Sequence, residues 1–197
     1  MAAAYPHHDS AASRYNKGMS QLEQIIAQID QQKRPPVHLW RPSLQGEIDI
    51  EIDAQANWFH EGGQIKRPEL VRLFSSILWH EDQQHFLVTP AEKLKIRVQD
   101  SPFVIQSAEY LEGRWVVTDN TAQSVIVGDR HPVSLREYQG QQLPYIKIRY
   151  DLWARVSRAV YYQWVTDAMN EGVEDDLALF SGDYEIRLTS EEASPQS

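Results

Sequence analysis

The chain has 197 residues, a net charge of −9 and 42% hydrophobic residues, which suits one folded domain or two small ones. It contains no cysteine, which excludes disulfides, thiolate metal ligands and a cysteine nucleophile. No apolar stretch approaches the roughly 20 residues of a membrane-spanning helix, and no strongly basic region suits long nucleic acid, so we expect neither kind of partner.

The two ends of the chain are unlike its middle. Residues 1–15 lack the basic start and apolar stretch of a signal peptide, and we expect a disordered leader there. Residues 171–197 hold eight acidic side chains against Arg187 alone, so most of the net charge lies in this segment. We expect an acidic tail over 173–197, which either solvates the chain or masks a surface or partner site. The absence of cysteine favours a cytoplasmic location.

Residues 16–84 are predicted to form a small α+β domain. Ser20 and Glu23 have the spacing of a capping box at the start of a helix. Isoleucines alternate with acidic residues over 47–53, which indicates a strand with an acidic outer face, and a second strand follows at 58–60. Pro68 then opens a helix whose apolar residues recur at helical spacing as far as Leu78.

Residues 85–172 are predicted to form a pleckstrin-homology-like domain. Asp151 is expected to cap a long helix over 152–169, and the segment from His80 to His85 is expected to be a loop. The fold class is therefore α+β, with a strand–strand–helix domain followed by a seven-stranded barrel capped by a C-terminal helix. Turn residues separate the seven expected strands, at 86–89, 94–98, 103–107, 115–118, 124–127, 133–136 and 146–150.

Three cations share one face of the expected strand at 94–98. Lys93, Lys95 and Arg97 alternate there with apolar residues, which is the period of a half-buried strand. These cations either receive an anionic ligand or pair with the acidic strand face at 47–53, and the sequence leaves both readings open.

Five positions near the two expected strand–helix junctions repeat at a constant separation of 83 residues. Either an internal duplication or shared helical patterning explains this repeat. The pairs are Ile65 with Ile148, Lys66 with Arg149, Arg72 with Arg155, Leu73 with Val156, and Ile77 with Val160.

Several short segments carry a family resemblance, and the sequence Thr-Pro-Ala-Glu-Lys at 89–93 is the most specific of them. The others lie at 63–67, 70–75, 86–88, 101–103, 130–132 and 144–149. With these segments the chain resembles the bacterial domain-of-unknown-function family 1285, over about residues 58–162. The resemblance implies a two-domain α+β protein with a duplicated core, a pleckstrin-homology-like second half, and a cleft between the halves for a nucleotide-type ligand in signalling. It implies no catalytic residue, and the acidic extension after Met169 lies outside it.

The expected ligand site combines cations with a flat aromatic side chain. Arginine suits such a site because its planar fork meets phosphate oxygens bidentately. The cations are expected to neutralise the anion, Tyr145 to supply the flat contact, and Thr89 and Glu92 to bond a sugar or base edge. The seven candidate residues are Arg72, Thr89, Glu92, Lys93, Tyr145, Arg149 and Arg155. No metal ligand set is predicted, and the sequence does not identify a cofactor.

Three functions remain open at this stage. The first is a non-enzymatic sensor that binds a small phosphorylated ligand, of nucleotide type, between its two halves. The second is an adaptor that docks a protein partner on the barrel. The third is an enzyme with Glu92 or His131 as acid/base, which the absence of nucleophile-elbow, P-loop and dinucleotide-binding motifs makes the weakest of the three.

Overall fold

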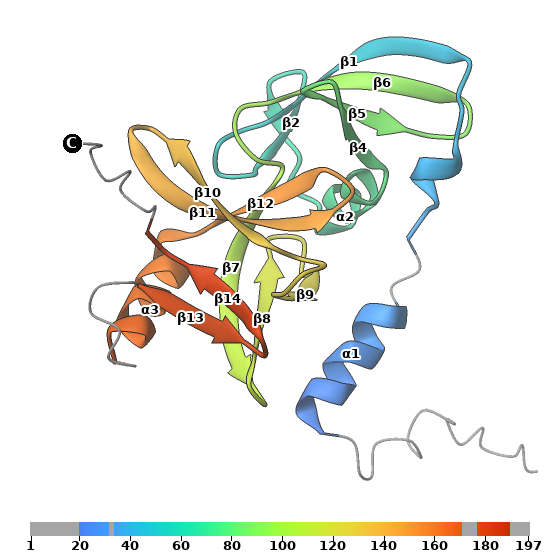
Figure 1. Cartoon of the computed structure of the whole chain (residues 1–197). Coiled ribbons are helices and arrows are strands. Elements are labelled where there is room, and N and C mark those ends of the chain that lie inside the picture. The colour runs from blue at the N-terminus through green and yellow to red at the C-terminus, as the bar shows by residue number, and fades with distance from the viewer. Residues whose placement is uncertain (1–19, 32–33, 171–176, 190–197) are drawn as a thin grey trace, which may run out of the picture.

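The computed structural model describes residues 20–31, 34–170 and 177–189, which form two six-stranded sheets, three α-helices and a C-terminal hairpin (Figure 1). This mixture of helices and strands confirms the expected α+β class and the helix that follows the second sheet. The expected leader lies outside the described residues, as do residues 173–176 and 190–197 of the expected acidic tail.

The first sheet has strand order β3-β2-β1-β6-β5-β4, with β1 and β6 parallel at its centre and every other pair antiparallel. Helix α2 (Pro68–Ser76) connects β3 to β4 and begins at the expected proline. The six strands are β1 (Leu44–Ile52), β2 (Trp58–His60), β3 (Gly63–Gln64), β4 (Leu78–Glu81), β5 (Gln84–Val88) and β6 (Glu92–Val98).

Strands β5 and β6 belong to this first sheet, whereas the sequence analysis placed them in the second domain. The pairing of β1 with β6 explains the difference, because it sets the acidic strand beside the cationic one. Lys95 lies 4.0 Å from Glu47, and Arg97 donates to Asp49 at 2.6 Å. Cross-strand pairing with the acidic face therefore accounts for Lys95 and Arg97.

The segment between β4 and β5 is a hairpin and not the expected loop. His80 and His85 lie opposite each other in the register, with ring centroids 4.5 Å apart. Strand β4 gives no clear signal in the sequence, because it is only four residues long and continues the apolar pattern of the preceding helix.

The second sheet has strand order β10-β11-β12-β7-β8-β9, with β12 and β7 parallel at its centre. If β7 is counted as the first strand of this half, and the order is read from the opposite edge, it is the same as the order of the first sheet. The two halves therefore repeat one topology. This structural repeat does not have the 83-residue separation noted in the sequence, because that separation would match Arg72 in helix α2 with Arg155 in a strand. The strands are β7 (Phe103–Leu111), β8 (Arg114–Asp119), β9 (Ser124–Ile126), β10 (Val133–Tyr138), β11 (Gln141–Arg149) and β12 (Leu152–Val156).

Helix α3 (Arg158–Asn170) starts later than expected, because residues 152–156 form strand β12. Alternate residues of this strand are buried, as its place beside the central strand β7 requires. Ser157 marks the start of the helix in place of Asp151, since its hydroxyl accepts the amide of Val160 at 3.4 Å.

Part of the expected acidic tail is structured. Strands β13 (Ala178–Ser181) and β14 (Tyr184–Arg187) form a hairpin that packs on β8. The buried hydroxyl of Ser181 accepts the amide of Trp115 at 3.0 Å and donates to the carbonyl of Val127 at 2.7 Å. The hairpin is therefore part of the second half.

The N-terminal helix α1 (Gln21–Gln31) also contacts the second half, although it comes first in the chain. The amide of Leu22 donates to Glu112 at 3.3 Å, and Figure 1 shows α1 lying away from the first sheet. The predicted capping box is confirmed, with Ser20 N to Glu23 at 2.8 Å and Glu23 N to Ser20 Oγ at 3.2 Å. A short 3-10 turn, η2 (Val37–Leu39), leads from this region to β1.

One continuous hydrophobic core joins the halves. It includes Ile52 and Trp58 from the first sheet, Ile105 and Ile146 from the second, and Trp164 from α3. All five side chains are almost fully buried. The two halves therefore pack as one body, and clefts between them are shaped by surface loops.

Candidate functional site

A cleft of about 350 Å³ lies between the two halves and is called here the inter-half cleft. Its first wall comes from the loop after β1, strands β2 and β3, and helix α2. Its second wall comes from β7 and the loop after β8. It is therefore a cavity at the junction, where a ligand would touch both halves.

The first wall is held by a loop anchored on an aspartate. Asp53 Oδ1 accepts the amides of Gln55 at 2.9 Å and Asn57 at 2.8 Å, and Oδ2 accepts the Asn57 side-chain amide at 2.9 Å. The backbone closes between the same ends, and Ala56 has φ 63°. Such an aspartate-centred turn fixes the backbone that faces the cleft.

The second wall repeats this loop with the same hydrogen bonds from backbone amides to the aspartate. Asp119 Oδ1 accepts the amides of Thr121 at 2.7 Å and Gln123 at 3.1 Å, and Ala122 again has φ 63°. Burial raises the pKa of the Asp119 carboxyl. Asn120 joins the two loops by donating to the carbonyl of Ala56 at 3.3 Å.

The charged side chains that line the cleft, among the described residues, are two cations, and no carboxylate belongs to this lining. Lys66 makes no hydrogen bond or ion pair with any part of the chain that the structure describes. Arg72 reaches Glu69, outside the lining, at 3.5 Å, and both side chains are at least half exposed. Such an exposed pair contributes little and leaves Arg72 available.

Neutral amides supply the remaining polar groups of the cleft. Gln55, Gln64 and Gln106 line it, and their side-chain amides have no hydrogen-bond partner among the described residues. Each amide offers two donors and an acceptor oxygen. Trp58 also lines the cleft, but it is only 1% exposed, and its ring stacks on that of Phe74 with centroids 6.0 Å apart. It therefore presents no free face to a ligand.

Of the seven residues predicted to bind the ligand, Arg72 alone lines this cleft. Tyr145 and Arg155 meet instead at a partly buried carboxylate, Asp100. The Tyr145 hydroxyl donates to Asp100 Oδ1 at 2.6 Å, and Arg155 Nε donates to Asp100 Oδ2 at 2.8 Å. Arg155 Nη2 also donates to the carbonyl of Ala54 at 2.5 Å. Burial and the Asp100 hydrogen bond raise the pKa of Tyr145. The polar groups of Tyr145 and Arg155 are therefore already bonded to other groups of the protein.

Arg149 is a partly buried link between the halves. Its guanidinium donates to the carbonyl of Ser75, at the end of α2, and to Gln123 Oε1 at 3.3 Å. Its charge lies 5.2 Å from the ring centre of Phe103. Burial, and then the charge of Arg34, lower the pKa of Arg149 to about 10.

Thr89 and Glu92 come together, but in a turn. The Thr89 hydroxyl accepts the amides of Ala91 at 3.3 Å and Glu92 at 3.1 Å, which closes the connection from β5 to β6.

His131, the other residue considered as an acid/base, forms a hydrogen bond between its Nδ1 and the carbonyl of Lys147 at 2.9 Å. In the described residues, no group of three or more potential ligand side chains is arranged for a metal ion.

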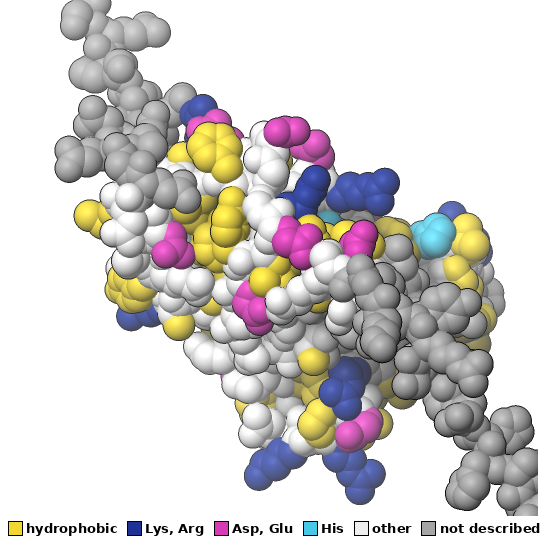
Figure 2. Space-filling model, turned by 90° about the horizontal axis from the view of Figure 1, so that it is seen from below, with side chains coloured by type: hydrophobic (Ala, Val, Ile, Leu, Met, Phe, Trp, Pro, Cys, Tyr) yellow, Lys and Arg dark blue, Asp and Glu magenta, His cyan; other side chains and the backbone are white. Residues whose placement is uncertain are grey.

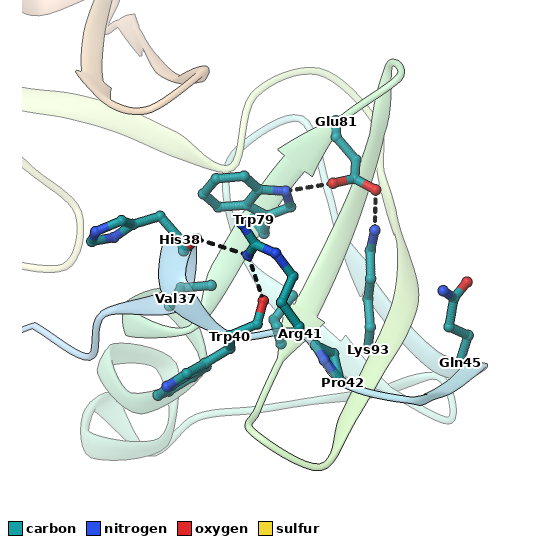
Figure 3. Close-up of a pocket in the computed structure, with 10 residues that line it drawn as sticks. Val37, His38, Trp40, Arg41, Pro42, Gln45, Trp79, Glu81 and Lys93 are labelled. Carbon is teal, nitrogen blue, oxygen red and sulfur yellow. Dashed lines mark hydrogen bonds and ion pairs between the residues drawn. The ribbon is translucent and has the colours of Figure 1, made fainter.

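Lys93 lines a second cavity, of about 390 Å³, which we name the tryptophan pocket (Figure 3). It lies between the segment after η2 and strands β4 and β6. Lys93 forms an ion pair with Glu81 and lies 4.1 Å from the ring centre of Phe86. The indole nitrogen of Trp79 donates to the same carboxylate at 2.8 Å. Arg41 reaches into the pocket beside Trp79 (Figure 3).

The structure thus distributes the seven predicted residues over separate places and shows cleft residues that the sequence reading did not select. Lys66 was noted only as part of the 83-residue repeat. A detectable signal existed, since Asp-Ala-Gln-Ala-Asn at 53–57 and Asp-Asn-Thr-Ala-Gln at 119–123 share their first, fourth and amide-bearing fifth positions.

Comparison with known families agrees with this two-part architecture. The N-terminal domain model of DUF1285, a domain of unknown function, matches residues 35–101, and its C-terminal domain model matches residues 102–188. The chain belongs to the DUF1285 family. The resemblance inferred from the sequence is confirmed. The DUF1285 match includes the C-terminal hairpin, beyond the end of the resemblance as inferred.

Solved structures of DUF1285 proteins have the same fold. One from Silicibacter pomeroyi DSS-3 is 32% identical, with a TM-score of 0.72, and the match covers 84% of this chain and 94% of that one. One from Shewanella baltica OS155 is 26% identical, with a TM-score of 0.50, and covers 60% of this chain and 91% of that one. No curated protein matches this DUF1285 chain significantly. Among the described residues, no helix has the length and apolar character to cross a bilayer.

Proposed function

We propose that this protein is a non-enzymatic ligand-binding protein that takes a small phosphorylated ligand in the inter-half cleft. The supporting observation is that Lys66 and Arg72 line a cavity at the junction without a carboxylate among its described lining. Lys66 has no acidic partner among the described residues, and Arg72 has only the exposed Glu69 at 3.5 Å. By contrast, Lys93 and Arg155 form ion pairs whose cations are largely buried.

The neutral lining determines the rest of the ligand. Three unpartnered glutamine amides beside two cations suit a phosphate ester whose remaining surface carries hydroxyl or amide groups. Nucleotides and sugar phosphates both meet this description. The aromatic platform expected from the sequence does not support a stacked base, since Tyr145 and Trp58 are both buried.

Affinity is expected to be modest. Hydrogen bonds to charged groups contribute about 1.5–3 kcal/mol each and neutral ones about 0.5–1.5 kcal/mol. Micromolar binding requires about 8 kcal/mol after ordering costs. Two cations and a few amides therefore predict dissociation constants from about 0.1 to 1 mM.

A signal would arise at the cleft rim in this proposal. The halves share one core, and Arg149, Arg155 and Asn120 tie them together, which opposes a large rotation. A bound ligand would instead stabilise the two aspartate-centred loops and alter the surface that they present. The cytoplasm, where phosphorylated metabolites are concentrated, is the location that we propose.

Thermal unfolding with paired ligands tests the proposal. A ligand at about 100 times its dissociation constant adds about 2.7 kcal/mol, or roughly 5–10 °C for a chain of this size. We expect AMP to stabilise the protein at about 10 mM and adenosine not to, and ribose 5-phosphate decides whether the base contributes. Lys66→Gln and Arg72→Gln should abolish the shift, whereas the matched Lys95→Gln should retain it. Absence of any shift with a phosphorylated panel, or a shift unchanged in both cleft variants, contradicts the proposal.

A second candidate, a protein-docking role, rests on an apolar surface near α3. Large apolar side chains on neighbouring elements are half exposed or more: Tyr110 of β7, Tyr162 and Met169 of α3, and Phe180 of β13. Figure 2 shows hydrophobic side chains gathered in patches between scattered charges on the lower face. A partner protein that binds the Lys66→Gln variant as it binds the wild type should not bind the Tyr162→Glu variant. Equal binding to both variants argues against this surface.

A further inference from the structure

The tryptophan pocket contains a guanidinium group, that of Arg41, that is held in place but forms no ion pair with the residues that the structure describes. Arg41 Nη1 donates to the carbonyl oxygens of His38 at 2.9 Å and Trp40 at 2.8 Å. Its Nε and Nη2 atoms make no hydrogen bond with the residues that the structure describes. Figure 3 shows the guanidinium among the side chains that line the pocket, which include the indole of Trp79. The backbone contacts thus pre-position a planar donor edge in a pocket that also has an aromatic wall.

The carboxylate in this pocket is already engaged by other donors. Glu81 accepts Lys93 on Oε1 and the indole nitrogen of Trp79 on Oε2. These two hydrogen bonds lower the pKa of Glu81, which keeps it ionised. With Lys93 neutralised by Glu81, the described lining has a formal charge of +1, which resides on Arg41.

This charge distribution selects the class of anion. A monoanion is matched by the free edge of Arg41. A phosphate monoester carries a second charge, for which the described lining offers no free cation and which Glu81 would repel. A carboxylate also has the two coplanar oxygens that the guanidinium edge meets bidentately.

The walls select the body of the ligand. Besides Trp79 and Trp40, the apolar side chains Val37, Pro42 and Val88 line the pocket. A cavity of about 390 Å³ accommodates a one- or two-ring molecule. Aromatic rings pack offset or edge-on against an indole and gain stability beyond their buried area.

We propose that the tryptophan pocket binds a small flat monocarboxylate, an aromatic or heteroaromatic acid, with its carboxylate on Arg41 and its ring against Trp79. The site is lined by the first half alone, so it does not depend on ligand binding in the inter-half cleft.

Indole-3-acetate is a suitable probe, and its neutral analogue indole-3-acetamide differs only at the carboxylate. In the ¹⁵N-labelled full chain, the six tryptophans give indole N–H signals, and Trp79→Phe identifies that of Trp79. We expect indole-3-acetate to shift the Trp79 signal with a dissociation constant of about 1 mM or below, measured by calorimetry. The amide and inorganic phosphate should bind at least tenfold more weakly.

Variants then test the contact with Arg41. Arg41→Gln should weaken indole-3-acetate binding at least tenfold. Arg41→Lys keeps the charge but loses the planar edge, so its affinity should lie between those of the wild type and Arg41→Gln. The exposed Arg158→Gln of α3 is the matched control and should bind as the wild type does. The proposal is overturned by equal binding of acid and amide, by wild-type affinity in Arg41→Gln, by a Trp79 signal that does not move, or by no binding up to about 20 mM.

Discussion

Replacement of Asp100 by alanine is expected to be among the most destabilising single changes in this protein. Asp100 is 12% exposed and Arg155 is 11% exposed, so the pair at 2.8 Å is largely removed from water. Removal of the carboxylate leaves a buried guanidinium without its counter-charge and the Tyr145 hydroxyl without its acceptor. Breaking a buried pair in this way costs about 3–5 kcal/mol.

The assay is urea unfolding followed by tryptophan fluorescence and circular dichroism. We expect Asp100→Ala to lower the free energy of unfolding by about 4 kcal/mol, and the melting temperature by roughly 8–16 °C. The exposed pair of Lys95 and Glu47 supplies the control, and Lys95→Gln should cost less than about 1 kcal/mol.

A double-mutant cycle separates the ion pair from simple loss of packing. Arg155→Met keeps much of the side-chain volume but strands the Asp100 carboxylate. The variant that carries both changes leaves no unpaired buried charge, so its cost should fall at least about 2 kcal/mol below the sum of the single costs. Additive costs, or an Asp100→Ala variant within about 1 kcal/mol of wild type, would refute the reasoning.

Three further predictions concern other parts of the fold. Thr89→Ala should cost about 1 kcal/mol of unfolding free energy in urea, because two turn amides lose their acceptor, and Thr89→Ser should restore it. Burial lowers the pKa of His85 from 6.5 to about 4, so the unfolded chain binds the proton more strongly and stability falls as pH drops from about 6.5 to 4. Unfolding measured across this range should show a loss on the order of 3 kcal/mol that His85→Gln reduces, and equal pH profiles would contradict the assignment. Ser181→Ala should cost about 1–3 kcal/mol, because the amide of Trp115 and the carbonyl of Val127 lose their shared buried partner, and a cost near zero in calorimetry would show that the hairpin does not depend on it.

Features set by near neighbours in the chain were predictable from the sequence. The capping box of α1, the proline that starts α2 and most strands of the second sheet follow from local patterns. The sequence predicts the start of α3 six residues too early because Asp151 resembles a cap, whereas Leu152–Val156 form a strand of the sheet beside β7. Tertiary pairing overrode the local preference.

The partners of the charged side chains were not predictable in the same way. Lys95 and Arg97 pair with their acids because β1 and β6 are parallel neighbours, and Arg155 of β12 pairs with Asp100 in the bend after β6. The inter-half cleft was not predictable from the sequence either. Its glutamines look like ordinary surface residues there, and they come together only where two loops that are distant in the chain meet.

The central parallel pairs have a consequence for how the chain is made. In each half the first strand pairs with the last, so Leu44 lies opposite Glu92 and Phe103 opposite Ala154. Such contacts join residues about 50 positions apart, and high contact order slows folding. On the ribosome, neither half can close its sheet until its final strand has emerged. The first half can do so while the second is still being synthesised, and the second then completes the shared core on a preformed surface.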